Sequence, residues 1–265
     1  MAVYPVGTVR HPKGMPEADE ALPAGPFVAA VLRSSVGGKV LVALTGLALV
    51  GFVIFHMIGN LKVFQGPDAI NGYAYFLKHD LGVLIWIARA GLLTLFVLHL
   101  GLALRLTLRS RAARPVAYRH PGSVQATTAS RTMIGTGVVV GLFVAYHLAH
   151  FTFGWVHTAT DPDGRSVNYL DLRDAQGRHD VYSMVVAGFG NPAIAGLYVV
   201  AQLALFVHLL HGIQSSFQTL GLKNRRFASC IWWLGLILAL SVLLGNIVIV
   251  VGVNLGWAPP VTGTG

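Results

Sequence analysis

The sequence predicts an all-α integral membrane protein with five transmembrane helices, and three observations support this prediction. Hydrophobic residues make up 54% of the 265-residue chain and charged residues only 11%, whereas about a quarter of the residues of a soluble domain are charged. Five apolar stretches reach the length of about 20 residues that a spanning helix needs. The formal charge of +9 comes from basic residues in the connections between these stretches, which is typical of membrane topology rather than of nucleic-acid binding.

The predicted elements form one membrane domain, residues 34–255. Residues 1–33 contain five prolines and mixed charges, so we expect an irregular cytoplasmic segment before the first helix. Residues 156–190 are polar, and we expect an ordered external loop or partner surface there. The fourth helix is expected to begin at Asn191-Pro192, because proline is favoured in a first helical turn. The five expected spans are 36–60, 82–106, 132–155, 191–219 and 229–254.

The distribution of charge predicts the orientation of the chain. The external loop 156–190 contains five aspartates and three arginines. The second connection has no acidic residue but six arginines, Arg105, Arg109, Arg111, Arg114, Arg119 and Arg131. The fourth carries Lys223, Arg225 and Arg226. Because cytoplasmic connections are rich in Lys and Arg, the N-terminus is expected inside and the C-terminus outside. The membrane itself is expected to be a bacterial cytoplasmic membrane. The arginine-rich connection is also a candidate surface for an acidic partner.

Histidines lie deep inside four of the five predicted spans. Ionisable residues in the hydrocarbon core are costly, so they usually face the bundle interior and serve a function. Imidazole is a good iron ligand, and inward histidines of a helix bundle can hold haem. A single buried histidine is more often an interhelical hydrogen-bonding residue, and that alternative applies to each one alone. The histidines are His56, His99, His147, His150, His208 and His211.

Two of these histidines match in depth in the outer half of the membrane. His56 comes 17 residues after Lys39, where the first helix enters from the inside, and His147 comes 16 residues after Arg131 on the third helix. Because an α-helix rises about 1.5 Å per residue, the two side chains are expected at similar height. The first four helices are thus predicted to form a haem-binding bundle with an outer pair, His56 with His147.

A second match lies in the inner half. His99 precedes Arg109 by 10 residues, and His211 precedes Lys223 by 12 residues. The predicted inner pair is therefore His99 with His211, roughly 9 Å of helix rise from the outer pair. The single Cys230 excludes attachment of haem through C-x-x-C-H, so any haem is held by ligation and packing, as in b-type cytochromes. Two further histidines are expected to support the ligands through hydrogen bonds, His150 and His208.

The motifs around these histidines are specific. The first span reads SSVGGKVLVALTGLALVGFVIFHMIGNL and the second RAGLLTLFVLHLGLALRLTLRSRAARP. The third reads SRTMIGTGVVVGLFVAYHLAHF, and the fourth ends in HLLHGIQSSFQTLGLKN. Together these segments, from about residue 34 to 250, resemble the five-helix dihaem cytochrome b subunit of succinate:quinone oxidoreductases.

This resemblance implies two haem b groups with axial ligands His56, His147, His99 and His211. It also implies that the chain is the membrane subunit of a succinate dehydrogenase, an enzyme complex whose flavoprotein subunit oxidises succinate. An iron–sulfur subunit on the inner face would deliver electrons, which cross the haems to a membrane quinone, expected to be menaquinone. The chain itself would bind haem, quinone and membrane lipid, with no catalytic residue for succinate and no nucleic-acid partner.

Haem propionates need cationic or hydroxyl donors near the membrane faces. Arg89 is the candidate near the outer end of the second span. The inner candidates are Lys39, Ser130, Arg131 and Lys223. For each of these residues, the alternative is an interfacial side chain whose charge reaches the membrane surface.

Other functions fit the same helix pattern. The architecture could operate as a quinol:fumarate reductase, because the net direction depends on potentials rather than on sequence. A dihaem cytochrome of a hydrogenase or formate dehydrogenase would have a different soluble partner. From another class, the chain could be a haem-free structural anchor or a transporter, but a transporter would favour broken helices or internal symmetry. The expected spans are continuous and show no repeat of 20–50 residues.

Overall fold

The computed structural model describes residues 34–113, 128–160 and 163–259. This part of the chain is mostly helical and has five helices that are long and apolar enough to cross a membrane. The predicted fold class is therefore confirmed. The predicted segment 1–33 lies outside the described residues, as do the side chains of Ser130 and Arg131.

The long helices begin where local chemistry favours a start. The hydroxyl of Ser34 accepts a hydrogen bond from the backbone N–H of Gly37, which caps the first helix. Asn191 caps the fourth in the same way, with Pro192 as its first residue, as predicted. The bounds are α2 Ser35–Asn60, α4 Val83–Ala112, α5 Thr128–His147, α7 Pro192–Thr219 and α8 Ala228–Asn254. A 3-10 helix, η1 Leu61–Gln65, continues α2, and a π-helix, η3 Leu148–Thr152, continues α5.

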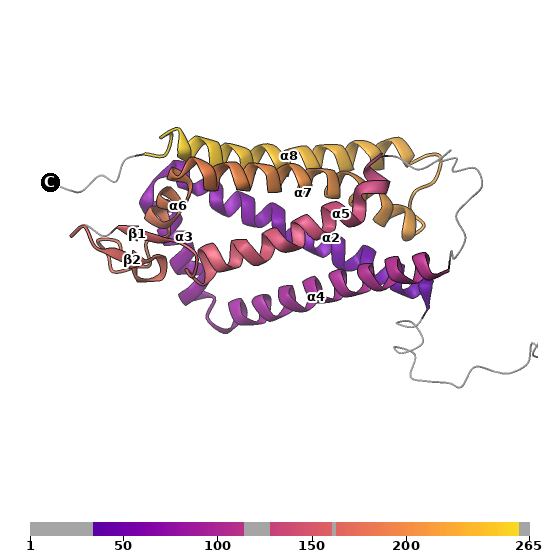
Figure 1. Ribbon diagram of the computed structural model, residues 1–265, viewed down its shortest axis with the longest axis horizontal. Helices are drawn as coiled ribbons and strands as arrows, with labels where there is room; N and C mark the ends of the chain where they lie inside the picture. The colour runs from indigo at the N-terminus through magenta and orange to yellow at the C-terminus, as the bar shows by residue number, and fades with distance from the viewer. Residues whose placement is uncertain (1–33, 114–127, 161–162, 260–265) are drawn as a thin grey trace, which may run out of the picture.

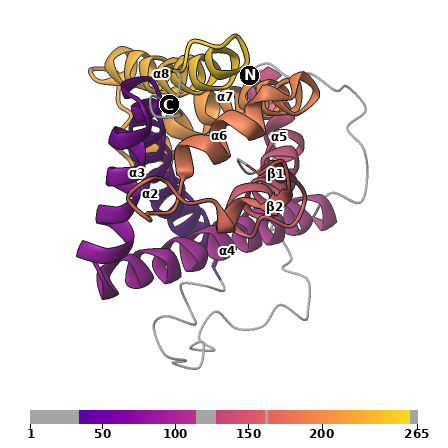
Figure 2. The same cartoon turned by 90° about the vertical axis from the view of Figure 1, so that its left-hand side faces the viewer.

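The five long helices run side by side along the long axis of the molecule (Figure 1). Helix α7 packs against α2, α5 and α8, whereas α4 packs mainly against α2. Figure 2 faces one end of the bundle and shows α2, α4, α5 and α7 following one another around it, with α8 beside α7. The four histidine-bearing helices thus surround a common interior.

Shorter elements cover one end of the bundle, on the left of Figure 1. We call them the cap. Between α2 and α4 it contains α3 Pro67–Tyr75 and the π-helix η2 Phe76–Asp80. Between α5 and α7 it contains an antiparallel hairpin, β1 Thr158–Thr160 with β2 Ser166–Asn168, then η4 Tyr169–Asp171 and α6 Val181–Gly190. The sequence predicted only a polar loop over 156–190. Helix α6 is apolar, but its ten residues are too few to span a bilayer.

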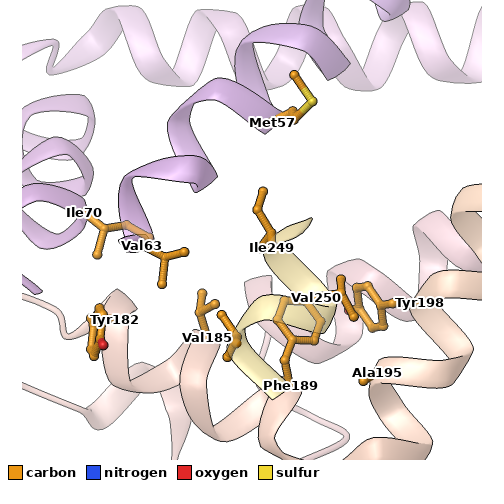
Figure 3. Packing of buried hydrophobic residues seen from close by; sticks show 11 residues of the cluster. Met57, Val63, Ile70, Tyr182, Val185, Phe189, Ala195, Tyr198, Ile249 and Val250 are labelled. Atoms are coloured by element: carbon orange, nitrogen blue, oxygen red, sulfur yellow. The ribbon is translucent and has the colours of Figure 1, made fainter. Parts of the chain in front are cut away.

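An apolar cluster joins the cap to the ends of the long helices (Figure 3). Tyr182, Val185 and Phe189 of α6 pack among residues of α2, α7 and α8. Figure 3 shows Phe189 beside Tyr198 of α7, and their ring centres lie 4.9 Å apart. Burial of these side chains holds α6 against the bundle.

A polar cluster, largely buried except at the exposed Asp68, ties the two parts of the cap together. Arg178 forms salt bridges with Asp68 at 2.6 Å and with Asp174 at 2.7 Å. The fully buried Asn71 of α3 donates hydrogen bonds to Asp174 and Asp180. Burial alone would raise the pKa of Asp174, but hydrogen bonds from Arg178 and from backbone N–H groups outweigh burial and lower it. The Asp174 carboxylate is therefore held ionised.

Candidate functional site

The outer histidine pair meets between α2 and α5. The rings of His56 and His147 have their centres 5.8 Å apart, with planes at 87°. Two imidazoles that bind one metal at about 2 Å from each nitrogen have ring centres about 6 Å apart. The structure therefore brings these two residues within the range of a shared metal, as their matched depths predict. That they bind one remains a prediction.

Hydrogen bonds orient the outer pair. Nδ1 of His147 lies 3.3 Å from the hydroxyl of Tyr198, which also lies 2.9 Å from Nδ1 of His150. With Nδ1 engaged, Nε2 of His147 is the nitrogen left for a ligand. His56 is held differently, because its Nε2 lies 3.1 Å from the side-chain nitrogen of Asn60. A metal bound through that atom would displace the Asn60 contact.

The structure does not test which histidine of α7 binds a haem together with His99, so the predicted pairing with His211 stays a prediction. The ring of His99 lies beside His208, with centres 6.4 Å apart and planes at 76°. The predicted partner, His211, is three residues further along α7, which is about 4.5 Å of rise and about 60° around the helix. The depth estimate counted from Arg109 and Lys223, whose long side chains reach the membrane surface from a range of depths. Such a count does not distinguish neighbouring turns.

His99 is seated on α2. Its Nδ1 lies 3.2 Å from the carbonyl oxygen of Val42 and 3.3 Å from the hydroxyl of Thr45. A Cβ atom added to Gly46 would lie 3.0 Å from Cε1 of the ring. Gly46 therefore provides the space for the imidazole, and its neighbour Thr45 contacts Nδ1. Nε2 is again left for a ligand.

His208 has the same kind of seat on α5. Its Nδ1 lies 3.3 Å from the hydroxyl of Thr136. A Cβ atom added to Gly137 would lie 3.3 Å from Cε1 of the ring. The same Thr-Gly step thus supports each histidine of the inner pair, although the two steps lie on different helices.

This correspondence extends to the outer pair. Gly46 precedes His56 by 10 residues on α2, and Gly137 precedes His147 by 10 residues on α5. Each of these helices then supports a histidine of the next long helix with its Thr-Gly step. The pairs α2–α4 and α5–α7 are thus related as two similar halves. These corresponding glycines and outer-pair histidines of the two halves lie 91 residues apart, so this relation falls outside repeat lengths of 20–50 residues.

Each pair offers only two imidazoles, which fits a metal whose remaining ligands come from a cofactor. Among the described residues, no group of three or more His, Cys, Asp or Glu side chains is gathered closely enough to hold a metal ion. A protein-ligated structural zinc site needs four such ligands, whereas haem iron needs only axial ones. Two separate imidazole pairs are consistent with the second case.

The structure also locates the other predicted site residues. Lys39 lines a small pocket of about 100 Å³ with Ser215, Ser216 and Thr219 of α7. Lys223 is exposed beyond the end of α7. Arg89 lies over the ring of Trp86 at 4.8 Å, beside a second pocket. The Lys39 and Arg89 pockets open at different sites, and neither is lined by a histidine of the two pairs.

His150 is fully buried where α5 meets the cap. Its Nε2 has no hydrogen-bond partner within the described part of the chain. A Cβ atom added to Gly188 of α6 would lie 3.2 Å from that nitrogen. Its other nitrogen shares the Tyr198 hydroxyl with His147, so His150 is placed to support the outer pair.

Comparisons with protein-family models, with curated proteins and with solved structures found no match. The length and hydropathy of the five long helices make the chain a multi-pass membrane protein, with two close histidine pairs inside the bundle.

Proposed function

We propose that the chain is a membrane cytochrome b that carries two haems. The observation that supports this most directly is the presence of two imidazole pairs, 5.8 and 6.4 Å between ring centres, each joining helices of the two similar halves. The outer haem would be held by His56 and His147 and the inner haem by His99 and His208. His208 is proposed in place of the predicted His211 because its ring is beside His99 and its Nδ1 is anchored like that of His99.

The surrounding residues would orient the ligands and exclude water. Thr45 and Thr136 hold Nδ1 of the inner histidines, and Tyr198 holds Nδ1 of His147. Such contacts fix the ring orientation and tune the ligand. When bound, haem supplies one-electron transfer between two oxidation states of its iron. The apolar helices around each pair provide a low-dielectric environment that favours packing of the macrocycle.

The motifs of the four spans resemble the dihaem subunit of succinate:quinone oxidoreductases, and we propose that role. The chain would anchor a flavoprotein subunit and an iron–sulfur subunit, and it would pass electrons to quinone, expected to be menaquinone. It would contribute to the enzyme without binding succinate. Arg111, at the end of α4 away from the cap, belongs to the arginine-rich connection proposed as the docking surface.

Reduced-minus-oxidised spectra of the purified chain, with haem quantified per polypeptide, test the cytochrome assignment. Two haems b per chain support it, and a folded chain that binds no haem when haem is supplied contradicts it. That second result would favour the haem-free anchor or the transporter.

The identity of the complex needs a separate measurement. Succinate should reduce the haems when the soluble subunits co-purify with the chain, and a variant with Arg111→Glu should retain less of them. Reduction by hydrogen or formate instead would assign the chain to one of those oxidoreductases. A dominant fumarate-reducing activity with quinol would favour the reverse direction.

A further inference from the structure

Basic residues gather at one pocket on the cap side of the molecule. The pocket has a volume of about 340 Å³ and lies between η2, the beginning of α4 and the end of η3. Its polar lining comes from Lys78, His79, Arg89 and Thr152, and its apolar lining from Ile85 and Trp86. It therefore offers cations and a hydroxyl next to aromatic and aliphatic surface.

These cations are not neutralised within the described part of the chain. No carboxylate there lies within salt-bridge distance of Lys78 or Arg89, whereas Arg165 and Arg178 are both paired. Lys78 instead contacts Nδ1 of His179 at 3.1 Å. Burial is the main cause that lowers the pKa of Lys78, and the nearby charges of Arg89 and Arg173 lower it further. The nearby acids are Asp80, which ends η2, and Asp180, whose charge acts on His179.

The positive charge around this pocket is not explained by the positive-inside rule. Arginines at the opposite end of α4 follow the positive-inside rule. The cap is the predicted outer side, where that rule gives no reason to concentrate cations. A pocket that gathers unpaired positive charge at a membrane interface is suited to an anion.

The pocket adjoins a surface suited to acyl chains. The first turns of α4 expose large apolar side chains, with exposed fractions of 74% for Val83, 62% for Leu84, 65% for Trp86 and 62% for Ile87. In a bilayer these residues face lipid, and tryptophan prefers the interface between hydrocarbon and head groups. The basic pocket and the apolar face of α4 thus adjoin each other as the head group and the acyl chains of a phospholipid do.

We propose that this pocket binds an anionic phospholipid at the membrane interface, with its phosphate between Lys78 and Arg89. Thr152 and His79 can donate hydrogen bonds to the same phosphate, and the acyl chains lie along the exposed face of α4. The proposal is independent of the cytochrome assignment, because it requires only that the chain spans a membrane. Arg89 then serves the lipid rather than a haem propionate.

The test uses the full chain in neutral detergent and follows quenching of tryptophan fluorescence by phosphatidylglycerol brominated on its acyl chains. Brominated phosphatidylcholine is the neutral probe, and inorganic phosphate is the competitor. A Trp86→Phe variant identifies the part of the signal that reports on the pocket. Because a basic residue near an anionic surface contributes roughly fivefold to affinity, Lys78→Gln and Arg89→Gln should each raise the half-saturating phosphatidylglycerol concentration about fivefold.

Lys62→Gln is the matched control. Lys62 of η1 is at the same end of the bundle, but it lies over the ring of Tyr73 at 5.6 Å and does not line the pocket. The affinity of the Lys62→Gln variant for phosphatidylglycerol should stay within about twofold of the affinity of the unmodified chain. Lys78→Arg should restore binding, which separates charge from folding.

Several outcomes would overturn the proposal. Equal quenching by the two lipids would remove the need for an anionic head group. Full displacement by inorganic phosphate would indicate a small-anion site. Loss of haem from Arg89→Gln with unchanged lipid affinity would assign Arg89 to a propionate, and unchanged affinity in both variants would exclude the pocket.

Discussion

The two histidine pairs are close in geometry but differ in what supports them. The inner pair is held by threonines of long helices, Thr45 for His99 and Thr136 for His208. In the outer pair, His147 depends on Tyr198 and, through it, on the buried His150, whereas His56 contacts Asn60. His150 stacks on Phe151 at 3.9 Å between ring centres and lies near Gly188 of α6.

The inner pair is therefore supported by the long helices alone, whereas the support of the outer pair also involves the cap. The seat of the inner pair needs only α2, α4, α5 and α7. The contacts that support the outer pair also require the packing of α6 and η3 at the cap. Changes in the cap should therefore act on the outer pair first, and changes in the Thr-Gly steps on the inner pair.

Removal of a ligand gives the largest expected effect. His99→Ala or His208→Ala should lose the inner haem and keep the outer one, and His56→Ala or His147→Ala should do the reverse. Haem per polypeptide and the remaining spectral component measure this. His211→Ala is the control and should keep two haems. Loss of the inner haem in His211→Ala with retention in His208→Ala would support the pairing predicted from depth.

Tyr198→Phe should affect the outer pair alone. The substitution removes the hydroxyl shared by His147 and His150, and such supporting contacts are worth about 10-fold to 100-fold in metal affinity. It also leaves Nδ1 of buried His150 without a partner, at a cost of about 1–3 kcal/mol. Redox titration resolved by haem should show a shifted or depleted outer component. An equal change in both components would contradict the separate support of the two pairs.

Alanine at the Thr-Gly steps should act on the inner pair with a smaller effect. The added Cβ would lie 3.0 Å from the His99 ring in Gly46→Ala and 3.3 Å from the His208 ring in Gly137→Ala. Both contacts are tight, so each ring must shift by tenths of an ångström, more so in Gly46→Ala. The absorption maximum and potential of the inner haem should move while haem content is retained. Gly91→Ala, where the added atom meets nothing within 4 Å, is the control.

Changing the protonation of the polar cluster in the cap should give the smallest effect, a change in thermal stability that depends on pH. The pKa of Asp174 is lowered in the folded protein, so its contribution to stability is full above its unfolded pKa, about 3.9. That contribution is lost as the pH falls through the lower folded value. Thermal unfolding at pH 7, 5 and 3.5 should show the loss below about pH 4. Asp174→Asn should flatten this part of the profile, and an unchanged profile would contradict the role of the cluster.

Much of the architecture could be predicted from the sequence because a bilayer imposes simple rules. Length and hydropathy locate five spans, and the predicted start at Asn191-Pro192 agrees with α7. Short elements could not be predicted in this way. Helix α6 is too short to satisfy the spanning rule, and its stability comes from contacts with the neighbouring α7 and with α2 and α8, which lie far from it in the sequence.

The histidines also show which features the sequence predicts and which depend on tertiary packing. Their positions along the chain place them inside the membrane and in an outer and an inner group, because helix rise converts residue number into depth. Residue number says little about how each helix is rotated or tilted. The neighbour of His99 depends on how α4 and α7 pack through α2 and α5, and three residues of register separate His208 from His211. Side-chain packing across helices settles that register, which no count along one helix can supply.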